Sequence, residues 1–402
     1  MIVRKNSLNT SLIAAIAFAV AIAPTAQAAP KKIAVKPFVL ITNDASAEGM
    51  VVTSKAIVTF ANIAGDTSDI QLRAIDFAGV QIWSKTIDSG RDEVATAISV
   101  DSQGSIWLVG NSAPATISES ETATVGVLNP DSVTVEIPNE IRGDMKDISL
   151  WQFSQLGELM SQMDLKISDP ALVDGISSNK TGTSILFTRD SGHSLALVKA
   201  GKLEKELKIG TSKSKFNAIF RGTDGSTSLF GSSSETLGGK KLAGKVDGVL
   251  LKVSKSGAIS KVVRSSAAGA TRGWQSATAG NFLTGVVKSG KKLETALTKF
   301  NASFAPTWTT RYASTGTSLA ASGDKSSVYA IFEPTAALKG VTGWKQRKGQ
   351  SIAMQFDSKG ALIGAFTDLL LSAPLAAGYS VEGGLVVLTS SGDLLQVKGN
   401  LT

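Results

Sequence analysis

The chain has 402 residues, of which 43% are hydrophobic and 18% charged, with a formal net charge of +8, one histidine and no cysteine. This composition excludes a disordered or collagen-like chain. The lack of cysteine excludes disulfides, cysteine-based metal sites and thiol nucleophiles, and the lone histidine, His193, excludes a two-histidine metal site within one chain.

The first 28 residues have the pattern of a secretory signal peptide. A basic start precedes an apolar stretch at 12–23, and the small-residue motif Ala-Gln-Ala follows at 26–28. The apolar stretch is shorter than the roughly 20 residues that a bilayer requires. We therefore expect residues 1–28 to be cleaved. The mature chain would have no transmembrane segment and would be secreted, either into a periplasm or to the cell surface.

After residue 30 the sequence has the pattern of a β protein, because short runs rich in Val, Ile, Leu, Phe and Trp alternate with Gly, Ser, Asp and Asn. A strand–turn–strand unit recurs along the chain. Its turn position is occupied in order by Gly79, Gly157, Gly201, Gly257, Phe304 and Gly360. Glycine suits hairpin turns that need positive φ, so we expect the turn at Phe304 to be of another type.

A second hairpin precedes many of these units, for example at 95–112, 216–233 and 317–334. Four strands in a repeat of about 40–50 residues are typical of β-propeller blades. Six repeats are complete, and the three strands at 375–400 would be completed by an orphan strand at 31–42. The sequence thus predicts an all-β, seven-bladed β-propeller over residues 30–402, closed by the N-terminal strand. Six or eight blades are the alternatives. A pair of β-sandwiches would not explain the four-strand period.

Two segments, DSQGSIWLVGNS (101–112) and VDGVLLKVSKSGAIS (246–260), resemble the repeats of secreted bacterial β-propeller proteins. Those repeats read roughly D-x-x-G-N-x-Y-V-x-G and then D-x-F-x-x-K-x-x-x-x-G. Trp83 and Trp308 each lie four residues after the turn position, which is similar to the blade-docking tryptophans of quinoprotein-type propellers. The resemblance implies a propeller fold and an extracytoplasmic setting. It carries over no catalytic residue.

Three loops between the second and third strands of a repeat are long: 113–146, 233–246 and 333–349. Such loops share one face of a propeller, so we expect all three on one face. Long loops on a repeat scaffold are where binding residues usually lie. The alternative is that they are surface insertions with no role.

Charge is distributed unevenly along the chain, with 10 basic and 19 acidic residues in 30–170 against 29 and 14 in 171–402. On a ring these stretches form opposite sectors, and the basic one would attract polyanions such as cell-wall polymers, anionic lipid headgroups or extracellular nucleic acid. The predicted binding residues are Lys240, Lys241, Lys245, Trp344, Lys345, Arg347 and Lys348, with the tryptophan as a stacking surface. Solubility through scattered lysines explains the same charges without a ligand, and head-to-tail self-association of the two sectors is a further alternative.

No catalytic signature is present: the sequence contains no G-x-S-x-G, H-E-x-x-H, phosphate-loop or calcium-loop motif. His193 follows Asp190 and Ser191 at a turn. Sequence neighbours on a hairpin do not face one another as triad residues do, so we expect an exposed turn histidine. No catalytic residue, metal site or cofactor is predicted.

The leading functional hypothesis is a non-catalytic binding module for a protein or an anionic polymer of the cell envelope, with nucleic acid not expected as the ligand. The alternative is a hydrolase or lyase acting on polysaccharide at the central channel. Carboxylates with raised pKa values around that channel would support the enzyme. A structural envelope protein without a ligand is the third hypothesis.

Overall fold

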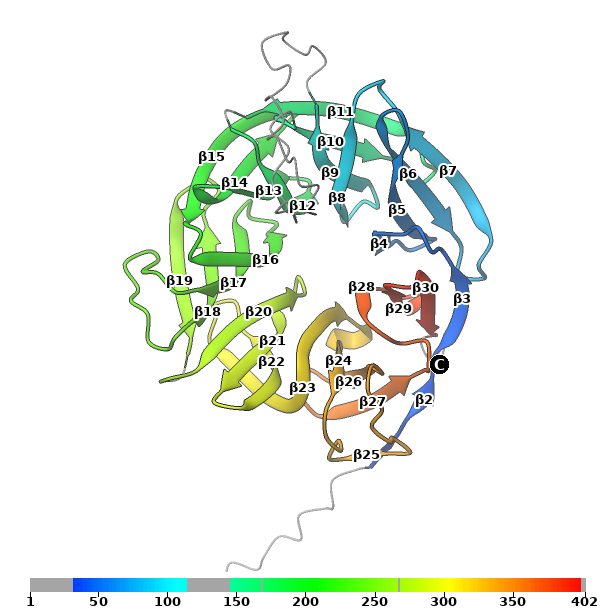
Figure 1. Ribbon diagram of the computed structural model, residues 1–402, viewed down its shortest axis with the longest axis vertical. Coiled ribbons are helices and arrows are strands. Elements are labelled where there is room, and N and C mark those ends of the chain that lie inside the picture. The colour runs from blue at the N-terminus through cyan, green and yellow to red at the C-terminus, as the bar shows by residue number, and fades with distance from the viewer. Residues whose placement is uncertain (1–31, 114–144, 168, 267, 399–402) are drawn as a thin grey trace, which may run out of the picture. The chain divides into compact units, whose positions relative to one another are not determined.

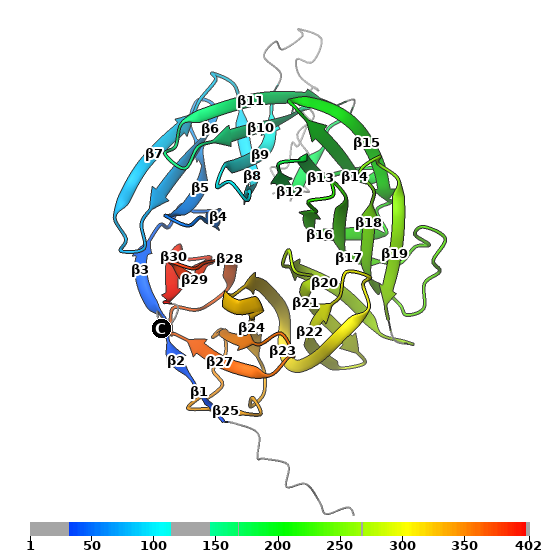
Figure 2. The ribbon, with the colours of Figure 1, turned by 180° about the vertical axis from the view of Figure 1, so that it is seen from behind.

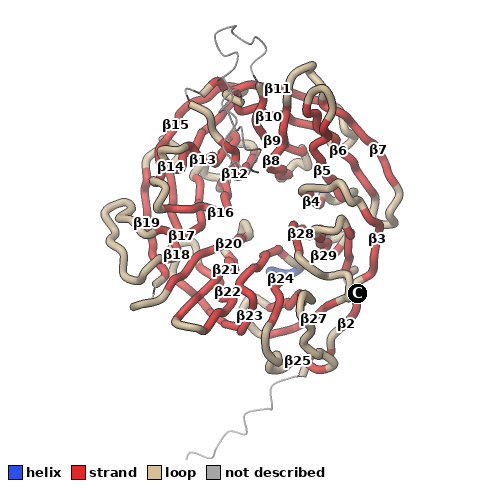
Figure 3. Tube along the Cα trace, viewed as in Figure 1, coloured by secondary structure: helices blue, strands red, loops and turns tan. Residues whose placement is uncertain are grey.

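β-Strands joined by turns make up the described part of the chain (Figure 3). The computed structural model describes residues 32–113, 145–167, 169–266 and 268–398, so the predicted signal peptide lies outside the described residues. Apart from a short 3₁₀ turn at Asp324–Ser326, the elements named in these ranges are strands. The expected all-β fold is confirmed.

Five sheets are separate four-stranded antiparallel blades. In chain order the first four consist of β4 (Gly49–Val52), β5 (Ile57–Ala64), β6 (Ser68–Ile75) and β7 (Gln81–Ile87); β8 (Glu93–Val100), β9 (Ile106–Ser112), β10 (Asp147–Phe153) and β11 (Leu159–Lys166); β12 (Leu172–Asn179), β13 (Gly182–Arg189), β14 (Gly192–Lys199) and β15 (Lys202–Gly210); and β16 (Ser214–Arg221), β17 (Thr227–Ser233), β18 (Asp247–Val253) and β19 (Ile259–Ser265). The fifth consists of β28 (Pro374–Ser380), β29 (Gly384–Thr389), β30 (Asp393–Val397) and β3 (Val39–Asn43).

The sixth sheet of the ring has eight strands, and it corrects the predicted blade count. Its order is β2 (Lys36–Pro37), β27 (Leu362–Thr367), β26 (Ile352–Phe356), β24 (Val328–Pro334), β23 (Pro306–Ser322), β22 (Lys292–Phe300), β21 (Phe282–Ser289) and β20 (Thr271–Ala277). The fifth and sixth repeats of the sequence are joined because β23, a strand of 17 residues, pairs first with β22 and then with β24. The structure therefore has five separate blades and one continuous sheet. The prediction of seven blades is wrong, and so are six and eight.

The six sheets are arranged as a ring (Figures 1 and 2). The first strand of each separate blade lies nearest the centre and contacts the first strand of a neighbouring sheet, as β8 does with β12 and β12 with β16. β28 contacts β4, which closes the ring. β29, in the middle of its sheet, is buried along its whole length.

Two asparagines connect neighbouring blades close to the centre of the ring. Asn62 on β5 donates from Nδ2 to the carbonyl of Ala95 (2.9 Å) and accepts from the Ala95 amide (2.8 Å). Asn111 on β9 makes the same paired contact with the carbonyl of Ala171 (2.7 Å) and the amide of Val173 (3.2 Å). Each side-chain amide thus forms hydrogen bonds with a backbone C=O and a backbone N–H of the neighbouring blade.

A second set of contacts, which we call the rim latches, joins neighbouring repeats at the outside of the ring. In each, the fourth residue after a turn position donates a hydrogen bond to a backbone carbonyl in the corresponding turn of the next repeat. The pairs are Trp83 Nε1 with Gln155 O (3.0 Å), Lys205 Nζ with Ser256 O (3.3 Å), Lys261 Nζ with Ser303 O (2.6 Å) and Trp308 Nε1 with Ser358 O (3.3 Å). Trp83 and Trp308 thus occupy equivalent places, as their spacing from the turns predicts.

The turn at Phe304 differs from its prediction. Phe304 has a φ of 58° and donates its amide to Asn301 O, as Gly360 does to Asp357 O with a φ of 86°. A non-glycine residue therefore occupies the same left-handed turn position, where its Cβ is strained. Burial of the ring in a core cluster with Phe230, at a centroid distance of 6.1 Å, offsets that strain.

The N-terminal strap, residues Ile33–Asn43, crosses from the eight-stranded sheet to the last blade. β1 (Ile33–Ala34) pairs with β25 (Val341–Thr342), β2 pairs with β27, and β3 pairs with β30. Between β2 and β3, Phe38 is buried against Phe366. The N-terminal strand thus completes the sheet of the C-terminal strands, as the orphan strand in the sequence led us to expect.

The latch at Trp308 predicts that a Gly→Ala change at Gly360 destabilises the fold more than the same change at Gly201. A Cβ on Gly360 would lie 2.7 Å from the Trp308 ring, whereas a Cβ on Gly201, which also has positive φ, would meet nothing within 4 Å. Both Gly→Ala changes strain the backbone by about 1–2 kcal/mol, and Gly360→Ala adds about 1–3 kcal/mol of overpacking. Urea unfolding followed by circular dichroism would measure the difference. In a Trp308→Ala background the two changes should lower the free energy of unfolding equally. Equal losses in the chain that retains Trp308 would contradict the latch.

Candidate functional site

Three of the predicted binding residues lie on the Lys240 loop, residues 234–246, which connects β17 to β18. Lys240, Lys241 and Lys245 are exposed. The loop is held at its base by Arg264 on β19, which donates to the carbonyl of Lys240 (3.1 Å) and to the carboxylate of Asp247 (3.1 Å). These contacts fix the loop backbone, so its lysines can meet a ligand without the cost of ordering the loop.

The buried carboxylate of Asp247 organises the same loop. It accepts the amides of Ala243 (3.0 Å) and Gly244 (2.8 Å) and the hydroxyl of Ser266 (2.5 Å). Burial alone would raise the pKa of Asp247, but these hydrogen bonds and Arg264 outweigh burial and lower that pKa. Asp247 is therefore committed to holding the loop.

The other four predicted residues lie on the Trp344 loop, residues 335–351, which connects β24 to β26 and contains β25. Lys345, Arg347 and Lys348 are exposed. Trp344 packs against the core cluster of the eight-stranded sheet, and its buried Nε1 has no hydrogen-bond partner. Core packing therefore already occupies the tryptophan that we expected to act as a stacking surface.

The two loops are not brought together. The Lys240 loop lies beside β19, and the Trp344 loop lies with β25 in another sector of the ring (Figure 1). Each connects the second and third strands of its repeat. Residues 114–144 of the third long loop lie outside the described residues, so the expectation that all three loops share a face stays a prediction.

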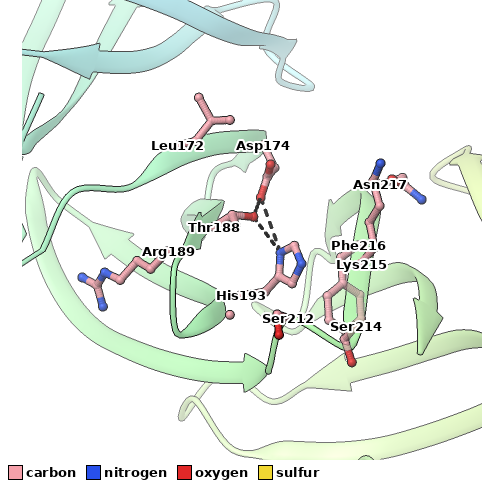
Figure 4. A pocket seen from close by; sticks show the side chains of 11 residues that line it. Leu172, Asp174, Thr188, Arg189, His193, Ser212, Ser214, Lys215, Phe216 and Asn217 are labelled. Carbon is pink, nitrogen blue, oxygen red and sulfur yellow. Dashed lines mark hydrogen bonds and ion pairs between the residues drawn. The ribbon is translucent and has the colours of Figure 1, made fainter. Parts of the chain in front are cut away.

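A pocket that the sequence analysis missed lies between the blade of β12–β15 and the first strand of the next blade, β16. Its volume is about 480 Å³. The starts of β12, β14 and β16 and the end of β13 line it, and His193 is among the lining residues (Figure 4). The expected exposed turn histidine is wrong, since His193 is only 7% exposed. A Cβ on Gly192 would lie 2.3 Å from the carbonyl of Gly210, so the turn before His193 packs directly onto the next connection.

The partners of His193 come from neighbouring strands. Thr188 Oγ1 lies 2.9 Å from His193 Nδ1 and donates its proton to Asp174 Oδ2 at 2.5 Å. A carboxylate only accepts hydrogen bonds and a hydroxyl has one proton, so the Thr188 oxygen must accept from an Nδ1–H. The edge-on contact of the imidazole with Phe216, at 5.8 Å between centroids, fixes the ring plane.

The pocket and the Lys240 loop share a hydrogen-bond network. Ser214, which lines the pocket, donates to the carboxylate of Glu235 at the start of the loop (2.6 Å), and the Thr211 amide donates to the same carboxylate (2.8 Å). Burial would raise the pKa of Glu235, but these hydrogen bonds outweigh burial and lower that pKa. The pocket and the basic loop are therefore adjacent parts of one framework.

The register of the β13–β14 hairpin was the signal that could have revealed this cluster. A two-residue turn at Asp190 and Ser191 places Thr188 directly opposite His193. The sequence analysis considered the chain neighbours of His193 and not its cross-strand partner, which in antiparallel pairs is the closer one.

Few carboxylates lie at the ring centre among the described residues. The first strands nearest the centre carry two carboxylates, Glu93, which is fully buried, and Asp174. The one aspartate or glutamate here with a raised pKa is Asp147, where burial and the nearby Asp164 outweigh Arg91. It lies on β10, away from the first strands. No group of three or more metal-ligating side chains occurs in the described ranges.

No family model matches the sequence, and the search of curated proteins found no match. Solved structures do match. A streptogramin B lyase is 12% identical with a TM-score of 0.50, covering 90% of this chain and 96% of its own. Virginiamycin B lyase from Staphylococcus aureus has the same identity and score, with coverages of 90% and 98%. The β-propeller domain of Cps50 (Swd1) from Myceliophteria thermophila is 11% identical with a TM-score of 0.50, covering 90% and 100%.

The chain is a β-propeller. At these identities the likeness extends to the fold alone, because propellers with the same architecture have unrelated activities. Within the described part of the propeller, no helix has the length and apolarity to cross a bilayer.

The contacts that run from His193 through Thr188 to Asp174, which we call the relay, predict an unusual tautomer of the imidazole. In the neutral imidazole the proton should lie on Nδ1, because Thr188 directs its own proton to Asp174. Asp174→Ala frees the Thr188 proton for Nδ1, so the ring should change to the Nε2–H tautomer. Asp190→Ala, a matched change at the adjacent turn, should leave the tautomer unchanged. The ¹⁵N spectrum of the single histidine measures both, and an Nε2–H tautomer in the unmodified chain would contradict the relay.

Proposed function

We propose that this chain is an extracytoplasmic β-propeller that binds an anionic polymer of the cell envelope and does not catalyse a reaction. The extracytoplasmic setting rests on the signal pattern in residues 1–28. The observation that carries the binding role is a concentration of basic side chains on neighbouring sheets from β12 to the first half of β23.

In residues 171–313 there are 22 Lys and Arg residues against eight Asp and Glu residues. We call this stretch the basic sector. The cations that have a carboxylate within 4.0 Å among the described residues are five: Arg189, Lys252, Arg264, Lys292 and Arg311. The other cations of the sector have no carboxylate within that distance among the described residues, although some, such as Lys205 and Lys261, donate to backbone carbonyls instead. Clustered charges of one sign create a potential that concentrates polyanions at the surface.

The Lys240 loop is the most favourable part of the basic sector for such a ligand. It is anchored through Arg264, Asp247 and Glu235, and it presents exposed lysines. The Trp344 loop adds three exposed cations in a neighbouring part of the propeller. A long polymer can contact both loops, whereas a small ligand cannot, because they lie in different sectors of the ring.

Retention of the mature protein on heparin tests this proposal with three charge-matched variants. Lys240, Lys241 and Lys245 are changed to Gln in the first, Lys345, Arg347 and Lys348 in the second, and the exposed Lys55, Lys85 and Lys359 in the control. Each loses three positive charges. We expect both loop variants to elute at clearly lower salt than the control. A variant that has lost contacts with heparin needs less salt to screen the contacts that remain.

Equal losses in all three variants would show that net charge alone causes retention and would overturn the proposed site. No retention of the unmodified chain at physiological ionic strength would overturn the proposal that the ligand is a polyanion. The search would then turn to a protein partner.

A further inference from the structure

His193 has one ring nitrogen that the fold does not use. Nδ1 is committed to Thr188, while Nε2 forms no hydrogen bond within the described residues and is not among the fully buried unpaired atoms. The ring lies at a pocket of about 480 Å³, which is in the range of small-molecule sites. Figure 4 shows Nδ1 turned toward Thr188 and Asp174 and the opposite side of the ring turned toward the β16 wall.

The charged side chains that line the pocket are two cations, Arg189 and Lys215, and one carboxylate, Asp174. Asp174 is the carboxylate in the lining, and it already accepts the Thr188 proton and lies 3.6 Å from His193 Nδ1. Arg189 is paired with Glu206 and stacks over Phe187, which leaves the exposed Lys215 as the cation without a carboxylate partner in the described lining. The whole pocket lies inside the basic sector, whose potential adds to that of Lys215.

The walls of the pocket also provide apolar surface. Leu172 at its edge is 48% exposed and offers an apolar contact. On the other wall Phe216 holds the imidazole edge-on. An imidazole and an ammonium group beside exposed apolar surface suit a ligand with a negative head and an apolar body.

We infer that the His193 pocket is a binding site for a small organic anion, either a carboxylate or a phosphate monoester, with an aromatic or aliphatic body. The ring contacts the anion as an imidazolium, in which Nδ1–H donates to Thr188 and Nε2–H donates to the head group. Lys215 adds a second positive charge, and Asp174 with Thr188 holds the ring in place. This site is separate from the proposed polymer surface, and its test does not depend on that proposal.

The test uses the one histidine of the chain as the reporter. The untagged, ¹⁵N-labelled mature protein has a single pair of imidazole ¹⁵N resonances, since the chain contains one histidine. It is titrated separately with benzoate, phenyl phosphate and the neutral benzyl alcohol. We expect saturable shifts of Nε2 with benzoate, phenyl phosphate or both, and no matching shift with benzyl alcohol. Which anion binds more tightly identifies the head group.

Two matched variants locate the charge. Lys215→Gln removes the cation that lines the pocket, and Lys213→Gln removes an exposed lysine two residues earlier that does not line it. Loss of one charge-assisted contact should weaken binding roughly tenfold in the first variant and little in the second. The inference is overturned if Nε2 fails to respond to either anion at millimolar concentration, if benzyl alcohol shifts it equally, or if both lysine variants weaken binding equally.

Discussion

The rim latches and the two asparagines are the directional contacts that hold neighbouring repeats in position. Backbone hydrogen bonds hold strands within a sheet, whereas the rim latches and the asparagine contacts between repeats are made by side chains. The apolar cores between blades are non-directional, so direction must come from polar contacts. Asn62 and Asn111 supply them near the centre, and the rim latches supply them at the outside. The Trp308 ring makes an apolar and a polar contact at once. It packs between Phe282 and Phe356, and its Nε1 donates to the next turn.

This rigid frame allows the polar chemistry of the molecule to gather between two blades. Ser214 links the pocket to Glu235, and Arg264 and Asp247 link Glu235 and its loop to β18 and β19. A ligand at the loop and a ligand at the pocket would therefore meet side chains that are already in position. Such preorganisation is the usual advantage of a repeat scaffold over a flexible surface.

Local patterns in the sequence predicted the hairpins, the turn positions, the tryptophans of the rim and the pairing of the chain ends, because each depends on residues close in sequence or on a strand without a partner. The continuity of β23 was not predictable in that way, since Gly316 and the serines around it read as a break between repeats. The turn at Phe304 was misjudged because its strain is offset by a core from another blade. The sequence pointed to the loop lysines, whose role in binding stays a prediction. It did not reveal the pocket, since Asp174, Thr188 and His193 meet only across three strands.

The N-terminal strap gives the molecule an unusually long-range closing contact. Asn43 and Asp393 are hydrogen-bonded although they are 350 residues apart in the chain. The intervening chain loses conformational entropy before this contact yields any stabilisation. We therefore expect the pairing of β3 with β30 to form slowly. Until the C-terminal strands exist, the growing chain can form individual sheets but only an open arc. Completion of the last blade therefore waits for the C-terminal strands, and loss of β3 would leave that blade with three strands.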